Sequence, residues 1–319
     1  MSGDSSGRSV GRIMKKLETA GRQTPSLVSD DATPLRADEN ARLTALFWGD
    51  AHASFLLPSR SAACLAAAKD VAAAESVFDA LLLAGDVTEN GEPSEYRFMA
   101  DCWDLMRDRV KHYIPATGNH DVRIRPIGVT ARRFGGFCER VGAPAQKGRL
   151  YYSQTVTGYR IIVLGTTRGT IEEAAIDEAQ LEFFSRELNA AGEGPVFVLL
   201  HQSLKNTHGL PEIFGKPSVS DGDVGAQSDT LREMMNARKN VFLLTGHIHT
   251  AFCALSYAKI GNIHSVNVPS LGTVAKNGDY NEPGTGYIIE VFDDRVRFRA
   301  RDHIRRIDLE QFDFEIALE

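Results

Sequence analysis

The 319-residue chain has little cysteine, and none of it is spaced as a metal or redox motif. Cys64, Cys102, Cys138 and Cys253 lie far apart, and no CxxC pair occurs. This spacing excludes a cysteine zinc framework and favours reduced, mostly buried thiols over disulfides. The N-terminus also lacks the apolar core of a signal peptide. Both absences favour a cytoplasmic protein.

Long apolar runs and an excess of basic residues are absent as well. No stretch approaches the roughly 18 unbroken apolar residues that a transmembrane helix requires, so no membrane span is expected. The net charge of −6 argues against a long basic groove for duplex nucleic acid, although a small basic pocket is compatible with it. Neither a membrane span nor duplex nucleic acid as a partner is therefore expected, and the sequence assigns no oligomeric state.

Residues 1–40 differ in composition from the rest of the chain. They are rich in Ser, Gly, Arg and Asp and poor in aromatic residues, which predicts a flexible N-terminal extension to a domain spanning residues 41–319. Within the extension, the stretch "VGRIMKKLETA" has apolar residues at helical spacing. Such a helix could dock on a partner or pack on its own domain.

From residue 43, short apolar runs alternate with amphipathic segments. The runs "LTALFW", "ALLLAGD", "PVFVLLH" and "VFLLTGH" have the length of buried strands. Helices are expected between them, for example over residues 59–79 and 228–238. Alternating buried strands and helices indicate an α/β domain. Because hairpin patterns follow toward the C-terminus, we predict an αββα sandwich of two mixed β-sheets flanked by helices.

Polar side chains follow five of the predicted strands, at the point where each strand ends. Ligands bind outside the carboxyl ends of the strands in open α/β sheets, so these side chains are expected at one edge. His247 and His249 in "GHIHT" could both be metal ligands. Alternatively, one could be a buried hydrogen-bonding residue and the other an exposed one. Recurrence at five strand ends favours metal binding. The side chains are Asp50, His52, Asp86, Asn119, His120, Asp121, His201, His247 and His249.

These side chains form a coherent set of metal ligands. Carboxylates, imidazoles and an amide oxygen suit Mn, Fe, Zn or Co. No cysteine joins them, which argues against a structural zinc site. Seven candidate ligands exceed the needs of one ion but fit two ions that share a carboxylate. Two metals about 3.5–4 Å apart form the usual clamp for phosphoryl hydrolysis.

The ordered motifs "DAH", "GDVTEN", "GNHD", "LLHQS" and "GHIHT" resemble those of the calcineurin-like metallophosphoesterases. The resemblance covers roughly residues 43–300. Within the superfamily, the chain looks most like the bacterial class III cyclic-nucleotide phosphodiesterases, because "VPSLGT" and "GYIIEVFDDRVRF" also have counterparts there. The resemblance implies the same fold, two metal ions and a phosphoester substrate.

The resemblance also implies a role for each residue. Asp50, His52 and His249 would hold the first ion, Asn119, His201 and His247 the second, and Asp86 would bridge both. Two residues would act in catalysis. His120 would contact the phosphate and protonate the leaving oxygen, and Asp121 would orient His120 through a hydrogen bond.

Substrate contacts are expected from Asn119 and His120, and more weakly from His208. His208 lies in a loop that should border the site, where it could touch substrate or face solvent. Arg168 and Tyr280 lie in loops that could flank the pocket, although ordinary loop roles fit them better. Gly85, Gly118 and Gly246, which stand within these motifs, are expected to allow close approach of the backbone to the metals.

The implied reaction is hydrolysis of a small, cyclic nucleotide-like phosphodiester by attack of a metal-bound hydroxide. The alternatives are a phosphomonoesterase acting on nucleotides or sugar phosphates, and a non-catalytic scaffold. Two related groups fit less well. Ser/Thr protein phosphatases carry Asp-Arg-Gly in the second motif and end the third in Glu, unlike "GDVTENG" and "GNHD". Purple acid phosphatases place a tyrosine ligand three residues beyond the bridging Asp, where this chain has Glu89.

Overall fold

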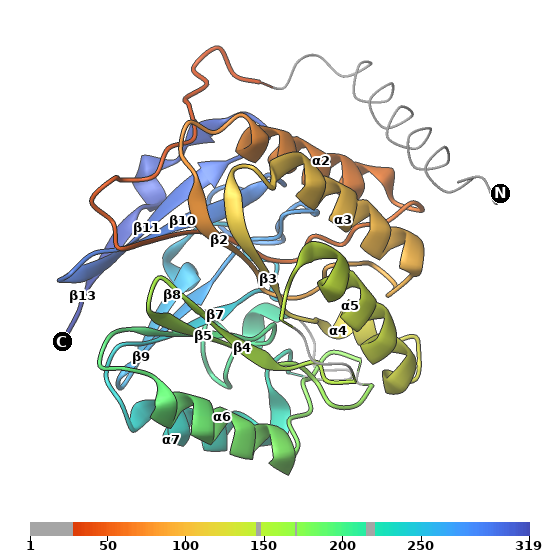
Figure 1. Cartoon of the computed structure of the whole chain (residues 1–319), viewed down its shortest axis with the longest axis vertical. Helices are drawn as coiled ribbons and strands as arrows, with labels where there is room; N and C mark the ends of the chain where they lie inside the picture. Colours follow the sequence, from red (N-terminus) through yellow and green to blue (C-terminus); the bar gives the residue numbers. More distant parts are fainter. Residues whose placement is uncertain (1–27, 145–147, 170, 215–220) are drawn as a thin grey trace.

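The computed structural model describes residues 28–144, 148–169, 171–214 and 221–319 (Figure 1). Its first sheet has the strand order β12-β11-β10-β1-β2-β3, and β13 also pairs with β11. Strands β1, β2 and β3 are parallel, whereas β10 and β11 extend the sheet in antiparallel fashion. The strands are β1 (Leu43–Trp48), β2 (Phe78–Leu83), β3 (Val110–Pro115), β10 (Thr285–Val291), β11 (Arg295–Asp302), β12 (Ile307–Asp308) and β13 (Phe314–Ala317).

The second sheet has the order β4-β5-β6-β7-β9-β8. Its four central strands are parallel, and the two edge strands run antiparallel to them. Both sheets are therefore mixed, as predicted. The strands are β4 (Tyr152–Val156), β5 (Tyr159–Val163), β6 (Val196–Leu199), β7 (Val241–Thr245), β8 (Tyr257–Ile260) and β9 (Ile263–Asn267).

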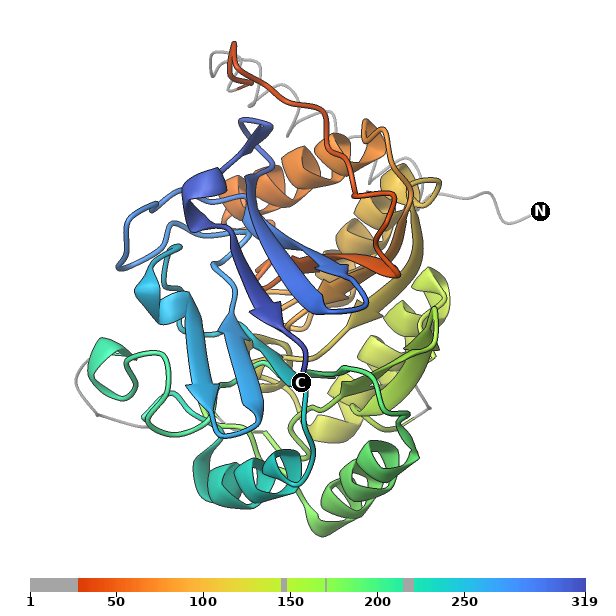
Figure 2. The same cartoon turned by 90° about the vertical axis from the view of Figure 1, so that its left-hand side faces the viewer.

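Helices cover the outer face of each sheet, so the domain has four layers. Helices α2 (Pro58–Ala72), α3 (Pro93–Met106) and α5 (Ile127–Val141) pack on the first sheet, and α6 (Glu178–Ala190) and α7 (Ser228–Asn236) pack on the second. Figures 1 and 2 show α2 and α3 at one end of the molecule and α6 and α7 at the other, with the sheets between them. The predicted αββα sandwich is confirmed.

The core between the sheets explains the continuous apolar runs in the sequence. Phe47 and Leu82 of the first sheet face Phe197 and Phe242 of the second, and all four are at most 1% exposed. The central strands β1, β2, β6 and β7 are covered on their other face by helices, so neither of their faces can be polar. No helix in the described part of the chain has both the length and the apolar character needed to cross a membrane.

The N-terminal boundary differs from the expected one. Residues 1–27, including the "VGRIMKKLETA" stretch, lie outside the described residues. Within residues 28–40, however, Leu35 is buried in the core beneath α2, and its carbonyl accepts from the Glu75 backbone. The Asp38 backbone N–H donates to Glu290 at 2.8 Å. The domain therefore includes part of the segment that composition assigned to the extension.

Candidate metal centre

The carboxyl ends of β1, β2, β3, β6 and β7 meet at one place, and the loops that follow them are joined by backbone hydrogen bonds. The Asp50 N–H donates to Gly85 and the Gly246 N–H donates to His201, each across neighbouring strands. The His247 N–H donates to the Asp50 carboxylate at 2.9 Å and so ties the two sheets together. This arrangement brings all seven candidate ligands into two adjoining clusters.

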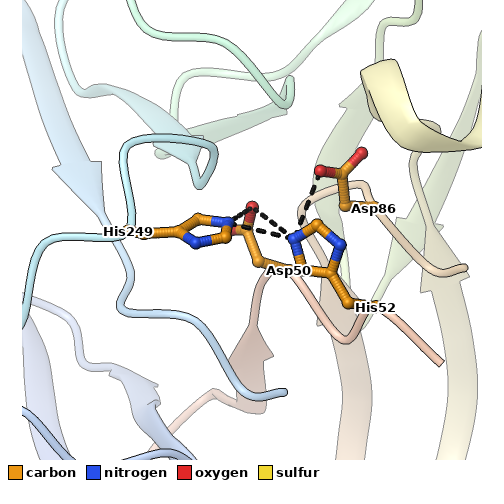
Figure 3. A group of neighbouring side chains, drawn as sticks. All are labelled: Asp50, His52, Asp86 and His249. Atoms are coloured by element: carbon orange, nitrogen blue, oxygen red, sulfur yellow. Dashed lines mark hydrogen bonds and ion pairs between the residues drawn. The ribbon is translucent and has the colours of Figure 1, made fainter. Parts of the chain in front are cut away.

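The first cluster contains Asp50, His52, Asp86 and His249. Figure 3 shows the imidazoles of His52 and His249 directed toward one another next to the Asp50 carboxylate. Their Nε2 atoms are 3.0 Å apart, and His249 Nε2 is 3.0 Å from Asp50 Oδ1. Asp86 Oδ2 lies 3.5 Å from His52 Nε2. Four potential ligand atoms thus converge on one point.

The second cluster shares Asp86 with the first. Asp86 Oδ2 is 3.2 Å from His201 Nε2, so the same oxygen faces both clusters. Asn119 directs its amide oxygen inward, 3.1 Å from His201 Nε2, because its amide nitrogen donates to Ile171 O at 2.9 Å. His247 completes the group. A carboxylate shared by two clusters is the arrangement that a bridging ligand requires.

The backbone at these residues is unusual. Ten non-glycine residues of the described chain have positive φ, and five of them are candidate ligands. Left-handed backbone is disfavoured for residues with a Cβ, and such conformations gather at functional sites where the surrounding structure enforces them. The five are Asp50 (φ 51°), His52 (φ 47°), Asp86 (φ 46°), His247 (φ 72°) and His249 (φ 55°).

Two glycines allow the carboxylates to approach the neighbouring loops. A Cβ on Gly118 would collide with the backbone and carboxylate of Asp86, and a Cβ on Gly246 would collide with the Asp50 carboxylate. Gly85 has φ 78°, and a Cβ there would meet the His201 ring. These glycines thus allow close packing of the loops around the candidate site, and their expected role in the approach of the backbone to bound metals stays a prediction.

The motif "VPSLGT" supports the first cluster from behind. Ser270 donates its hydroxyl to the Asp50 carbonyl at 2.9 Å. Thr273 Oγ1 lies 3.0 Å from His249 Nδ1 and therefore turns Nε2 of that ring toward Asp50. Histidines that bind metals usually have their second ring nitrogen held in this way.

Burial and opposite charges compete within the site. Burial favours the neutral carboxyl of Asp86, yet His201 and His120 outweigh it and hold the pKa of Asp86 well below its usual value. Burial lowers the pKa of His201, but Asp86 and Asp50 raise it to about 10. The pKa of His247 lies well below its usual value because burial and His201 both disfavour its charged form.

The His247 imidazole tests whether these residues suit metal ions. Its Nε2 is buried and has no hydrogen-bond partner among the described residues. An unpaired buried nitrogen is costly unless it has a ligand. The nearest carboxylate oxygen, Glu172 Oε2, is 4.0 Å away. The buried His/Asp clusters, with a neutral imidazole directed into one of them, are consistent with a binuclear metal site.

The orientation of His120 differs from the expected one. Its Nδ1 lies 3.1 Å from the Glu89 carbonyl oxygen and 3.3 Å from Glu89 Oε2, while Nε2 lies 3.0 Å from Arg123 Nη1. A guanidinium can only donate, so Nε2 accepts and the ring proton is on Nδ1. Glu89 and Arg123 therefore orient this ring, and the assignment of that role to Asp121 is wrong.

Asp121 instead joins the loops that follow β2 and β3. Its carboxylate accepts from the backbone N–H groups of Val87, Thr88 and Gly118 at 2.9–3.1 Å, and from the Tyr96 hydroxyl at 3.2 Å. Burial and the nearby Asp86 raise the pKa of Asp121 to about 6. Asp121 thus holds Asp86 beside Asn119 and His120 without touching the His120 ring.

The residues given weaker roles lie away from the clusters or have other partners. His208 is only 3% exposed, and its ring nitrogens contact Leu255 O at 2.7 Å and Ser265 Oγ at 2.8 Å. Both expectations for His208, contact with substrate and exposure to solvent, are therefore wrong. Tyr280 donates to Asp302 at 2.7 Å, which is an ordinary loop role. Arg168 is exposed.

Three side chains beside the site were not identified from the sequence as functional residues: Arg60, Glu89 and Arg123. Glu89 Oε2 accepts from His52 Nδ1 at 2.9 Å and also contacts Arg60. Its position three residues after Asp86 was a usable signal. No comparable sequence signal marked the two arginines, because neither directly follows a core strand. Arg60 lies in α2, and Arg123 follows the short helix α4 (Asn119–Val122).

Comparison with known families agrees with this geometry. The model of the calcineurin-like phosphoesterases matches residues 43–251, which include every candidate metal ligand. The match covers more than half of the chain, so the chain belongs to the calcineurin-like phosphoesterase family. It is a metallophosphoesterase by family and by its His/Asp cluster. A comparison with curated proteins gives no match.

Several solved structures are similar to this chain, and the first of them shows the same fold. A purple acid phosphatase, PPD1 from yellow lupin seeds, has a TM-score of 0.55 at 14% identity, with 86% of this chain and 53% of the lupin chain covered. This chain thus spans about half the length of the lupin enzyme. A mutant Vps29 from Entamoeba histolytica has a TM-score of 0.39 at 10% identity, with 87% and 100% covered. A predicted phosphoesterase from Streptococcus pneumoniae has a TM-score of 0.39 at 13% identity, with 86% and 97% covered.

Proposed function

We propose that this protein hydrolyses small phosphodiesters, including cyclic nucleotide-like ones, with the aid of two metal ions. The observation that carries the proposal is the pair of buried clusters that share the Asp86 carboxylate. Family membership supports a metal-dependent phosphoesterase. The preference for a diester rests on the resemblance of the motifs, including "VPSLGT", to the class III phosphodiesterases.

In this proposal, Asp86 would be shared between the two ions, and the two clusters would provide the other ligands. Asp50, His52 and His249 would hold one ion, and Asn119, His201 and His247 would hold the other. When bound, two ions from the group Mn, Fe, Zn and Co would lower the pKa of a water and neutralise charge on the phosphoryl oxygens.

The chain's own residues supply the contacts to the substrate. His120 is 18% exposed, and its ring lies edge-on to His52 with centroids 4.4 Å apart, so it borders the first cluster. Its backbone N–H donates to Asp86 at 2.8 Å, which fixes the start of α4 against the site. The His120 Nε2 accepts from Arg123, so it can donate to a substrate oxygen only after it gains a proton and exchanges the Arg123 contact for the substrate. That protonated ring is suited to donate to the leaving oxygen.

The experiment compares bis(p-nitrophenyl) phosphate with p-nitrophenyl phosphate, in the presence of Mn²⁺ and then with a chelator. We expect the diester to turn over faster than the monoester and both rates to disappear with the chelator. Faster monoester turnover would refute the diester preference and indicate a phosphomonoesterase. Equal rates with and without bound metal would refute metal dependence altogether.

A further inference from the structure

Two arginines and one glutamate form a charged group at the edge of the candidate metal centre. Glu89 contacts Arg60 through Oε2, and its Oε1 lies 3.5 Å from Arg123 Nη2. We call Arg60, Glu89 and Arg123 the rim cluster. Its two guanidinium side chains are 25% and 26% exposed, whereas the Glu89 side chain is 13% exposed. The positive groups thus lie nearer to solvent than the carboxylate between them.

The rim cluster is directly connected to the first cluster, through His52, and to the candidate catalytic residue His120. Glu89 accepts from His52 Nδ1 at 2.9 Å, on the ring edge opposite the candidate metal-binding Nε2. Arg123 lies 3.0 Å from His120 Nε2, the atom expected to face the scissile phosphate. An anion bound next to that phosphate would therefore come within reach of Arg123, and Arg60 shares the same carboxylate partner.

The charges of the rim cluster do not balance. Two guanidinium groups face one carboxylate, and each guanidinium carries five N–H donors. The interactions that the structure describes for Arg60 and Arg123 involve Glu89 and the His120 ring. Most of their donors therefore remain for a ligand, in a partly covered position where a charge-assisted hydrogen bond is strong.

A purely structural arginine in the same chain looks different. Arg301 is fully buried, and all three of its nitrogens have partners. Its Nε and Nη2 donate to Asp70 at 2.7 and 2.9 Å, and Nη1 donates to Asp308 at 3.0 Å. The contrast argues that the rim cluster does more than link α2 to the loops of the site.

We propose that Arg60 and Arg123 bind a second phosphate of the substrate, one that is bonded next to the scissile phosphate. Arginine suits this role because its planar donors match two oxygens of a phosphate at once. Glu89 is the positioning residue, since it holds both guanidiniums and the His52 ring in place. This inference rests on the proposed phosphoesterase function and adds the substrate class, phosphoesters that contain a diphosphate group.

The test measures ligand binding and needs no turnover. The Mn²⁺-loaded full chain is titrated calorimetrically with α,β-methylene adenosine diphosphate, which cannot be cleaved between its phosphates, and with adenosine monophosphate. We expect the diphosphate analogue to bind at least about tenfold more tightly, which corresponds to about 1.4 kcal/mol. Arg60→Gln and Arg123→Gln should each remove most of this preference, and Arg60→Gln, whose side chain contacts Glu89, should change monophosphate binding much less.

Arg125→Gln is the matched control. It removes the same charge two residues after Arg123, where Arg125 pairs with Glu92 at 2.7 Å and is 46% exposed, and it should keep the wild-type preference. Equal affinities for the two nucleotides in the wild type would overturn the inference. So would an unchanged preference in both rim variants, with folding verified by circular dichroism.

The outcome is separable from that of the proposed function. A protein that prefers the diphosphate but turns over neither p-nitrophenyl compound would keep the rim site and lose the hydrolase assignment. A protein that hydrolyses these compounds without any diphosphate preference would keep the hydrolase assignment and lose the rim site.

Discussion

Replacement of Glu89 by glutamine tests how the structure controls the first cluster. Glu89 accepts from His52 Nδ1 at 2.9 Å and is 13% exposed. The substitution keeps the size of the side chain and a neutral acceptor but removes the charge. We expect weaker metal binding, because the negative carboxylate both fixes the His52 ring and increases the basicity of its Nε2.

The size of the effect follows from that hydrogen bond. A bond to a charged partner contributes about 1.5–3 kcal/mol, and one between neutral groups about 0.5–1.5 kcal/mol. The difference of about 1–1.5 kcal/mol corresponds to roughly tenfold in affinity. Loss of the charge near two cations adds to this, and carboxylates that hold a metal-binding histidine typically account for 10–100-fold. We expect a loss of affinity within that range.

The assay is a calorimetric titration of the metal-free protein with Mn²⁺, followed by activity at saturating Mn²⁺. Glu92→Gln is the control, because Glu92 pairs with Arg125 and Arg133 outside the two clusters. It should bind Mn²⁺ as the wild type does. A Glu89→Gln protein whose Mn²⁺ affinity stayed within twofold of the wild type would refute the reasoning.

Three further predictions concern other parts of the molecule. Asp86→Ala should lose most metal at both sites and nearly all activity, because one oxygen faces both clusters; normal metal content by mass spectrometry would contradict the bridging role. His120→Ala should keep its metal but lose substantial rate, and the loss should be larger for phenyl than for p-nitrophenyl esters if the ring protonates the leaving oxygen. Equal losses would favour phosphate stabilisation instead. At Asp70, burial raises the pKa, but Arg301 and His303 outweigh it and lower the pKa to about 2. The ionised Asp70 carboxylate therefore stabilises the fold at pH values above its usual pKa of about 3.9. This contribution of about 2 kcal/mol to the free energy of unfolding disappears as the pH falls from about 4 to 2. Denaturant titrations of Asp70→Asn should show a correspondingly smaller change in the free energy of unfolding between about pH 4 and pH 2 than the wild type shows. If the free energy of unfolding of the variant depended on pH as strongly as that of the wild type, this network would be excluded as the cause.

The αββα architecture could be predicted because the central strands of the two sheets are buried on both faces. A run such as "LTALFW" has no charged residue and a single polar one, Thr44, which limits it to the interior of a layered domain. Short or half-exposed edge strands carry no such signal. Strands β8, with the sequence "YAKI", and β13, with "FEIA", have exposed residues and form through their pairing with β9 and β11.

The candidate ligands could be recognised from the sequence because each lies just after the end of a core strand. Chain direction alone brings the ends of parallel strands together, and the chemistry of Asp, Asn and His does the rest. Their partners could not be derived in this way. Sequence adjacency suggested that Asp121 orients His120, whereas the ring contacts Glu89 and Arg123.

The sequence by itself thus determined the layered fold, the positions of the seven ligand-type side chains and the class of chemistry, because these depend on local pattern and strand direction. The tertiary structure alone decided which side chains support them. It buried His208 against Ser265, 57 residues away, and placed Arg60 of α2 on Glu89, 29 residues away. Such contacts depend on how separate loops pack on one another, and no local spacing encodes that.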